Sequence, residues 1–237
     1  MVTVRTSLMA GSAALVALLA ALATTVGLGY FSWGVGLACG VVTTVAVARG
    51  AAGALGPADL ITLSRAVLTC ALAALVADSF VDRAAVTTLV VLATVALVSD
   101  AIDGWVARRT QTSTFGARFD GEVDAFLILV LSVYVADTVQ GWVLAIGLAR
   151  YAFAAAGWVL PWMRRGLPPR YWRKVVTAVQ GIVLTVAAAA VVPHWLATAA
   201  LVVALALLAE SFGRDVLWLW HRRPAGRERL AGPVPRP

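Results

Sequence analysis

Four aspartates stand close together in one stretch of the sequence, with apolar sequence on both sides. Asp103 follows Asp100 by three positions, and Asp124 follows Asp120 by four. On an α-helix these spacings put the members of each pair on one face, about 60° and about 40° apart around the axis. Grouped carboxylates repel one another strongly where water is scarce, so they require a cation. Oxygen ligands favour a hard divalent ion, Mg²⁺ or Mn²⁺, and we expect two such ions.

Salt bridges offer an alternative explanation for the same carboxylates. Arg108, Arg109 and Arg118 lie in or beside the segment that separates the two pairs, and a solvated loop would also tolerate the charges. Paired spacings on two adjoining helices are unusual for a solvated loop, so the metal site is favoured. Glu122 lies off the face of the second aspartate pair, and we expect it at the surface or in a supporting position.

Small residues and one arginine flank the aspartates. Gly104 and Gly116 lack Cβ, so either a ligand or a neighbouring helix can approach the backbone closely there. Ala107 fits the same interpretation, and Arg108 is suited to gripping a phosphate.

The composition places these residues in a membrane protein. Of the 237 residues, 61% are hydrophobic and 13% are charged, whereas soluble domains are about half apolar and about a quarter charged. The net charge of +7 is attributed to cytoplasmic loops, and no nucleic-acid partner is expected. Cys39 and Cys70 lie in apolar runs without ligand spacing, which argues against a zinc site and a disulfide framework.

Eight apolar segments have roughly the 20 residues that a membrane-spanning helix needs. They cover approximately residues 7–27, 30–48, 60–78, 85–106, 117–136, 141–163, 174–193 and 196–219. The sequence therefore predicts an all-α, polytopic transmembrane bundle. The first segment also resembles a signal peptide, but its length favours an uncleaved helix.

Charge asymmetry predicts the orientation of this bundle. With the amino terminus in the cytoplasm, the basic residues between the spans fall on the cytoplasmic side, with Arg83 as the exception. This agrees with the positive-inside rule. We therefore expect a multi-pass protein of the cell membrane, with both termini and the aspartates on the cytoplasmic side.

The aspartate stretch reads D-x2-D-G-x2-A-R-x7-G-x3-D-x3-D. It resembles the signature of the CDP-alcohol phosphatidyltransferase family, in which eight residues usually separate the Arg from the second Gly. The segment GPADLITLSR, which ends at Arg65, resembles the family's P-N-x-[IL]-T-x-x-R segment, with Asp59 in place of the usual Asn. Further along, Arg150 and the run from Lys174 to Gln180 resemble features of the phosphatidylglycerophosphate-synthase branch.

The resemblance implies a six-span core and a homodimer. The chain would then divide into two N-terminal transmembrane helices (1–56), a six-helix core (57–220) and a basic cytoplasmic tail (221–237).

The resemblance also implies a reaction in phospholipid biosynthesis. A CDP-alcohol, commonly CDP-diacylglycerol in bacteria, would donate its substituted phosphate to the hydroxyl of a polar acceptor and release CMP. Asp100, Asp103 and Asp120 would bind metal, and Asp124 would also reach a metal and serve as the general base. The CDP pocket would be formed by Gly104, Ala107, Arg108 and Gly116.

The acceptor is left open by the sequence. Basic and polar residues expected at or near the cytoplasmic face are its candidate contacts, namely Arg65, Arg150, Lys174, Thr177 and Gln180. Many cations favour a phosphorylated acceptor, such as glycerol 3-phosphate or inositol phosphate, whereas inositol or serine would need fewer.

Two other functions fit parts of the pattern. Membrane prenyltransferases hold a diphosphate on Mg²⁺ between Asp-rich motifs, but they lack the compact D-G-x2-A-R and G-x3-D block. A divalent-cation transporter would also place acids inside the membrane. Transporter sites usually lie near the bilayer midplane in paired repeats, and the sequence shows no second copy of the aspartate block.

Overall fold

The computed structural model describes residues 3–51, 55–82, 85–107, 113–164 and 171–222, without the side chains of 103–107 and 164. Within this part of the chain every regular element is helical. The elements are α1 (Val4–Val26), α2 (Tyr30–Gly50), α3 (Pro57–Asp78), α4 (Val86–Ala107), α5 (Thr114–Thr138), α6 (Leu144–Val159), α7 (Tyr171–Ala189) and α8 (His194–His221), with short 3₁₀ turns η1 (Gly141–Val143) and η2 (Pro161–Arg164). The expected all-α bundle of about eight spans is confirmed.

Six of the helical segments in the described residues are long and apolar enough to cross a membrane by themselves. They are α1, α2, α3, α7, α8 and the segment Gly141–Val159, which joins η1 to α6. Residues Val86–Ile102 of α4 are also apolar, and α5 carries charged residues of the aspartate stretch in its first half. The clustered aspartates thus lie on α4 and on the more polar first half of α5.

Local sequence signals account for where several helices begin and end. The Thr3 hydroxyl accepts a hydrogen bond from the Thr6 N–H and caps α1, which ends at Gly27 in the left-handed conformation (φ 78°). Pro57 occupies the first turn of α3, where its missing N–H is not needed. Ser113 caps α5 by accepting a hydrogen bond from the Gly116 N–H at 2.9 Å.

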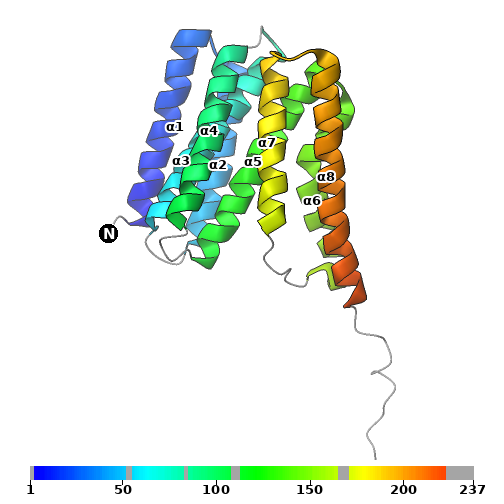
Figure 1. The fold of residues 1–237 in the computed structure, drawn as a ribbon. Coiled ribbons are helices and arrows are strands. Elements are labelled where there is room, and N and C mark those ends of the chain that lie inside the picture. The colour runs from blue at the N-terminus through cyan, green and yellow to red at the C-terminus, as the bar shows by residue number, and fades with distance from the viewer. Residues whose placement is uncertain (1–2, 52–54, 83–84, 108–112, 165–170, 223–237) are drawn as a thin grey trace, which may run out of the picture.

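Helix α3 is the centre of the bundle. It contacts α1, α2, α4 and α5, and it is by far the most buried of the candidate spans. On its far side α5 contacts α6 and α7, and α7 contacts α4 and α8. The helices stand side by side, and the start of α1 lies at the same end of the bundle as the end of α8 (Figure 1).

The turn between α1 and α2 is tied to the other end of α3. The Asp78 carboxylate accepts hydrogen bonds from the Gly29 N–H at 2.9 Å and from the Ser32 hydroxyl at 2.7 Å. Asp78 is 9% exposed, and these two donors compensate for its burial. The first two helices are thus attached to the rest of the bundle by polar as well as apolar contacts.

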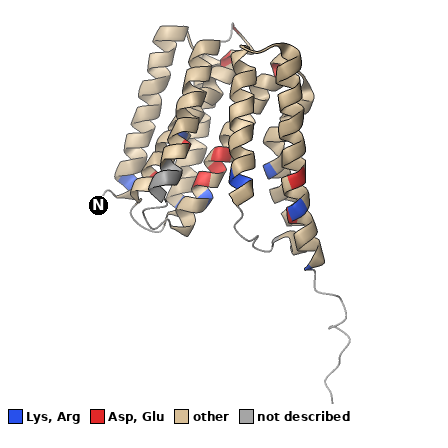
Figure 2. Ribbon diagram, viewed as in Figure 1, with Lys and Arg blue, Asp and Glu red and all other residues tan. Residues whose placement is uncertain are grey.

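The charges of the described residues are distributed unevenly. Lysines and arginines gather in the half of the bundle where α1 begins (Figure 2). Of the basic tail expected at 221–237, all but the first two residues lie outside the described part of the chain.

Candidate functional site

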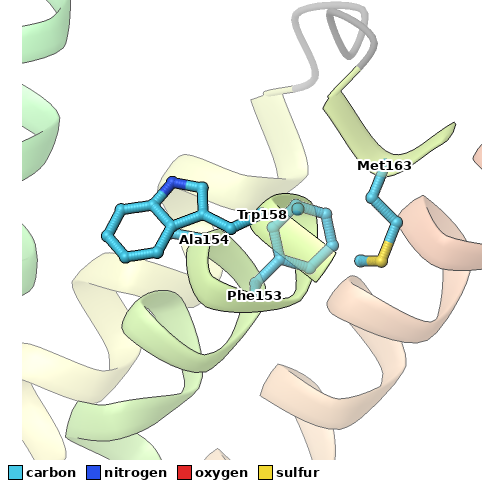
Figure 3. A pocket seen from close by; sticks show the side chains of 5 residues that line it. Phe153, Ala154, Trp158 and Met163 are labelled. Carbon is cyan, nitrogen blue, oxygen red and sulfur yellow. The ribbon is translucent and has the colours of Figure 1, made fainter. Parts of the chain in front are cut away.

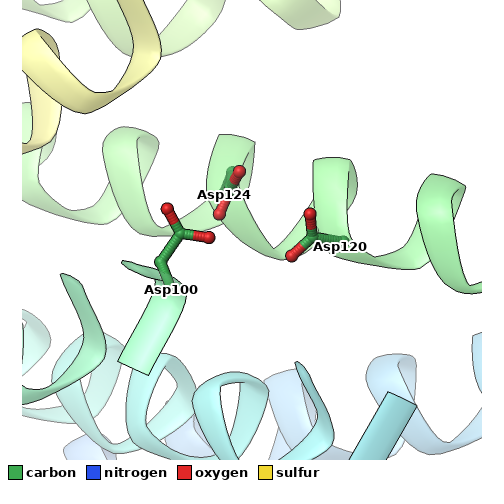
Figure 4. Close-up of side chains that lie close together, drawn as sticks. All are labelled: Asp100, Asp120 and Asp124. Atoms are coloured by element: carbon green, nitrogen blue, oxygen red, sulfur yellow. The ribbon is translucent and has the colours of Figure 1, made fainter. Parts of the chain in front are cut away.

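Three of the four predicted aspartates come together between two helices. Asp100 lies on α4, and Asp120 and Asp124 lie on α5 (Figure 4). One carboxylate oxygen from each lies within 4.8 Å of those of the other two. The four-residue spacing on α5 places its two carboxylates on one face, as the helical period requires. This is a spacing at which three carboxylates can share a cation.

Several predicted site residues have side chains outside the described part of the structure. Asp103, Gly104 and Ala107 belong to the backbone of α4, but their side chains are outside the described part, and Arg108 lies between the described ranges. Their roles in metal and CDP binding remain predictions.

Arg65 is the cation that the structure places among the aspartates. Its Nη1 lies 3.0 Å from Asp100 Oδ1 and 2.7 Å from Asp120 Oδ1, and its Nη2 donates to Asp124 Oδ1. The Arg65 side chain is 1% exposed, although arginine is almost never fully buried unless paired. The sequence predicts Arg65 as a contact of the acceptor, and it offers Arg108, Arg109 and Arg118 as alternative salt-bridge partners of the aspartates.

The charges of this cluster do not cancel. Three carboxylates face one guanidinium, which leaves two formal negative charges. Asp100, Asp120 and Asp124 are 37%, 31% and 21% exposed, so the site opens to the outside of the bundle. Lys174, at the start of α7, is near enough to act electrostatically on Asp100. An all-oxygen ligand set with this excess charge fits a hard divalent cation.

Gly116, in the first turn of α5, lies against Asp59, in the first turn of α3. A Cβ at this position would overlap the Asp59 carboxylate and would lie 3.2 Å from the Ser113 hydroxyl. The other Asp59 oxygen accepts the Gly56 N–H at 2.9 Å, at the start of α3. Gly116 therefore permits contact between two helix ends, and its expected contact with CDP stays a prediction.

The candidate acceptor residues lie on three helices, namely Arg65 on α3, Arg150 on α6, and Lys174, Thr177 and Gln180 on α7. Arg150, on α6, forms an ion pair with Glu122 at 2.6 Å, and both side chains are about half exposed. Because Glu122 is two residues from Asp120, this pair lies on another face of α5. Glu122 is thus at the surface, as expected.

Helix α7 carries the other candidates. Lys174 is exposed, and the half-buried Thr177 donates a hydrogen bond to the Arg173 carbonyl at 3.0 Å. Gln180 is 2% exposed, and its Nε2 has no hydrogen-bond partner in the described part of the chain. Buried amide donors are usually paired, so Gln180 is suited to meeting a polar group from outside the chain.

A polar contact between α7 and α8 was not anticipated. Arg173 Nε lies 3.2 Å from Asp215 Oδ2, and the Asp215 side chain is 5% exposed. Trp172, the residue before Arg173, donates a hydrogen bond from Nε1 to Glu210 Oε2 on α8 at 3.0 Å. The sequence contains one sign of this contact, because the acids Glu210 and Asp215 lie in the last apolar segment. Ionisable residues inside membrane spans are rarely without a role.

Two hollows lie away from the aspartates. One, of about 630 Å³, is lined by Phe153, Ala154, Gly157, Trp158 and Met163 (Figure 3). The other, of about 510 Å³, runs between α1 and α3 and is almost wholly apolar. Neither lining includes a titratable side chain, so neither competes with the aspartate cluster as a site for chemistry.

Comparison with known proteins gives one match. The family model described as CDP-alcohol phosphatidyltransferase matches residues 56–209, which include the three clustered aspartates and Arg65. No curated protein and no solved structure matches the chain significantly.

Proposed function

The chain belongs to the CDP-alcohol phosphatidyltransferase family, and we propose that it transfers a phosphatidyl group from CDP-diacylglycerol to a polar alcohol at a divalent-metal site. Members of the family are transferases that move the substituted phosphate of a CDP-alcohol to an alcohol, within phospholipid biosynthesis. The family match favours this reaction over prenyl transfer and over cation transport.

The observation that carries the proposal is the meeting of three aspartate oxygens within 4.8 Å of one another beside a buried arginine. We assign Asp100, Asp103 and Asp120 to Mg²⁺ or Mn²⁺, with Asp124 also in reach. Two bound ions would supply charge stabilisation for both the attacking and the leaving oxygen. Arg65 holds the carboxylates in place and offsets part of their repulsion.

The proposed reaction is a single displacement at phosphorus. The acceptor hydroxyl oxygen forms a bond to the lipid-bearing phosphorus, the bond from that phosphorus to the CMP oxygen breaks, and Asp124 accepts the hydroxyl proton. Asp124 suits this part because it lies one turn beyond Asp120 on α5 and is the least exposed of the three aspartates. Gly104, Ala107, Arg108 and Gly116 are proposed to shape the CDP pocket.

The charge asymmetry supports a location in the cell membrane, with the site and both termini in the cytoplasm. A site at that interface would take the donor lipid sideways from the bilayer and the polar acceptor from water. Residues 57–220 would form the catalytic core, 1–56 an addition to it and 221–237 a basic tail. A homodimer is proposed from the family resemblance.

We propose that the acceptor is phosphorylated. Lys174 is near enough to act electrostatically on Asp100, and Thr177 and Gln180 follow it along α7, where Gln180 is buried. The Lys174 ammonium group would bind the phosphate of the acceptor. The Gln180 amide, whose Nε2 has no hydrogen-bond partner among the described residues, would donate to a hydroxyl of the acceptor. Arg150 would contribute after leaving Glu122.

The test is turnover by the purified protein in lipid nanodiscs. CDP-diacylglycerol, Mg²⁺ or Mn²⁺ and a panel of phosphorylated and neutral alcohols are supplied, and released CMP and the lipid product are measured. We expect CMP release only with metal, and its loss in Asp124→Asn while CDP-diacylglycerol still binds. Asp137→Asn is the matched control, because Asp137 lies exposed at the other end of α5.

Full turnover by Asp124→Asn would remove this residue from the role of base. Turnover with a prenyl diphosphate in place of CDP-diacylglycerol, or metal uptake without CMP, would overturn the proposed reaction.

A further inference from the structure

Helices α1 and α2 precede residue 56, where the match to the family begins, so the family core does not account for them. One end of each helix belongs to an apolar cluster that also contains residues of α3 and α5. A buried apolar cluster joins Val47 of α2 and Leu63 of α3 to Phe119 and Val123 of α5, and Val4, Leu8, Ala51 and Phe115 pack around it. We name this group of residues the α5 anchor.

The anchor residues of α5 and the site residues of α5 form two adjacent strips. Phe115, Phe119 and Val123 repeat every four residues along one strip, and each is followed directly by Gly116, Asp120 and Asp124, respectively. Because successive helical residues are about 100° apart, burying the first strip determines the direction in which the second one points. Phe119 and Val123 are 8% and 5% exposed, so the first strip is indeed buried.

The last residue of α2, Gly50, lies against a ring of the α5 anchor. A Cβ at Gly50 would overlap the Phe115 ring, with the ring Cδ2 only 2.8 Å away. The Phe115 ring in turn stacks on that of Phe119, with centroids 5.8 Å apart and planes 10° from parallel. Gly50 thus meets the ring pair that stands immediately before Asp120 in the chain.

We propose that the N-terminal helix pair is a positioning element for the metal-binding face of α5, acting through Gly50 on Phe115. Gly50 and Phe115 touch neither the carboxylates nor substrate in this assignment, so they are positioning residues. The proposal rests on the metal role given above to Asp120 and Asp124. It predicts that disturbing the end of α2 changes metal affinity and kcat, although the change lies outside residues 56–209, which match the family.

The test compares Gly50→Leu with Gly34→Leu in the same helix. A Cβ at Gly34 meets nothing within 4 Å, so that variant is the matched control. Mn²⁺ affinity is measured by electron paramagnetic resonance on the intact protein, with kcat and KM for the donor measured separately and the melting temperature taken in EDTA. We expect Gly50→Leu to weaken Mn²⁺ binding and lower kcat at least tenfold, since displacements of about 1 Å have effects of that order or more. KM for the donor should change little.

The double variant Gly50→Leu/Phe115→Ala provides the rescue. Removing the ring makes room for the added side chain, so Mn²⁺ affinity and kcat should recover relative to Gly50→Leu alone. Unchanged Mn²⁺ affinity and kcat in Gly50→Leu would overturn the proposal, as would losses that match a fall in the folded fraction. Failure of the proposed function is distinguishable: the wild-type protein would bind no Mn²⁺, or Asp120→Asn would bind it normally.

Discussion

Replacement of Arg65 by methionine tests the charge balance of the aspartate cluster most directly. Methionine keeps much of the buried volume and removes the guanidinium that contacts Asp100, Asp120 and Asp124. Carboxylate oxygens within 4.8 Å of one another repel by about 3 kcal/mol per pair at an effective dielectric constant of about 20. We therefore expect the Arg65→Met protein to depend on metal for its stability.

The size of the effect follows from the burial of the partners. Removing one member of a fully buried ion pair costs about 3–5 kcal/mol. The aspartates are 21–37% exposed, so the lower end applies, about 3 kcal/mol. For a chain of this size each kcal/mol shifts the melting temperature by about 2–4 °C. In EDTA, Arg65→Met should thus melt about 6–12 °C below the wild type.

Added Mg²⁺ should recover most of this loss, because a cation bound to the carboxylates replaces the missing charge and stabilises the state that binds it. The assay is a thermal melt in EDTA and in rising Mg²⁺, with Arg150→Met as the control. Arg150 belongs to a half-exposed pair, and such pairs contribute at most about 1 kcal/mol. Equal melting temperatures in EDTA, together with equal Mg²⁺ shifts in variant and wild type, would refute the reasoning.

Three further predictions concern the surroundings of the cluster. In steady-state assays, Arg150→Ala should raise KM for a phosphorylated acceptor several-fold and leave KM for the donor unchanged. An unchanged KM for the acceptor would count against a contact between Arg150 and the acceptor. Gly116→Val should lower the melting temperature and CMP release, because the side chain would overlap the Asp59 carboxylate; wild-type values for both would show that α3 and α5 separate freely. Asp215→Asn should destabilise the protein by about 1–3 kcal/mol through the weakened contact with Arg173, as measured by chemical unfolding; no change would make that contact dispensable.

The helical content and the pairing of aspartates were accessible from the sequence because both depend on local periodicity. Apolar runs of spanning length predict the helices, and the spacing of Asp120 and Asp124 predicts a shared face whatever the neighbours are. The resemblance in the aspartate stretch likewise led to the family that the match over residues 56–209 shows. The observed ends of most helices differ from the predicted ends by a few residues. At the start of α5, for example, the Ser113 cap determines where the first turn begins.

Contacts between helices were not accessible in this way, since no local rule says which face of one helix meets another. The sequence marks Arg65 only as a candidate contact of the acceptor, and packing of α3 at the centre of the bundle places the Arg65 guanidinium against three carboxylates. Packing alone likewise brings Asp59 against Gly116 and Gly50 against Phe115. The sequence by itself determined which residues carry charge and on which helical face they stand. The tertiary structure decided which charges neutralise one another, because electrostatic energy depends on distances across the bundle.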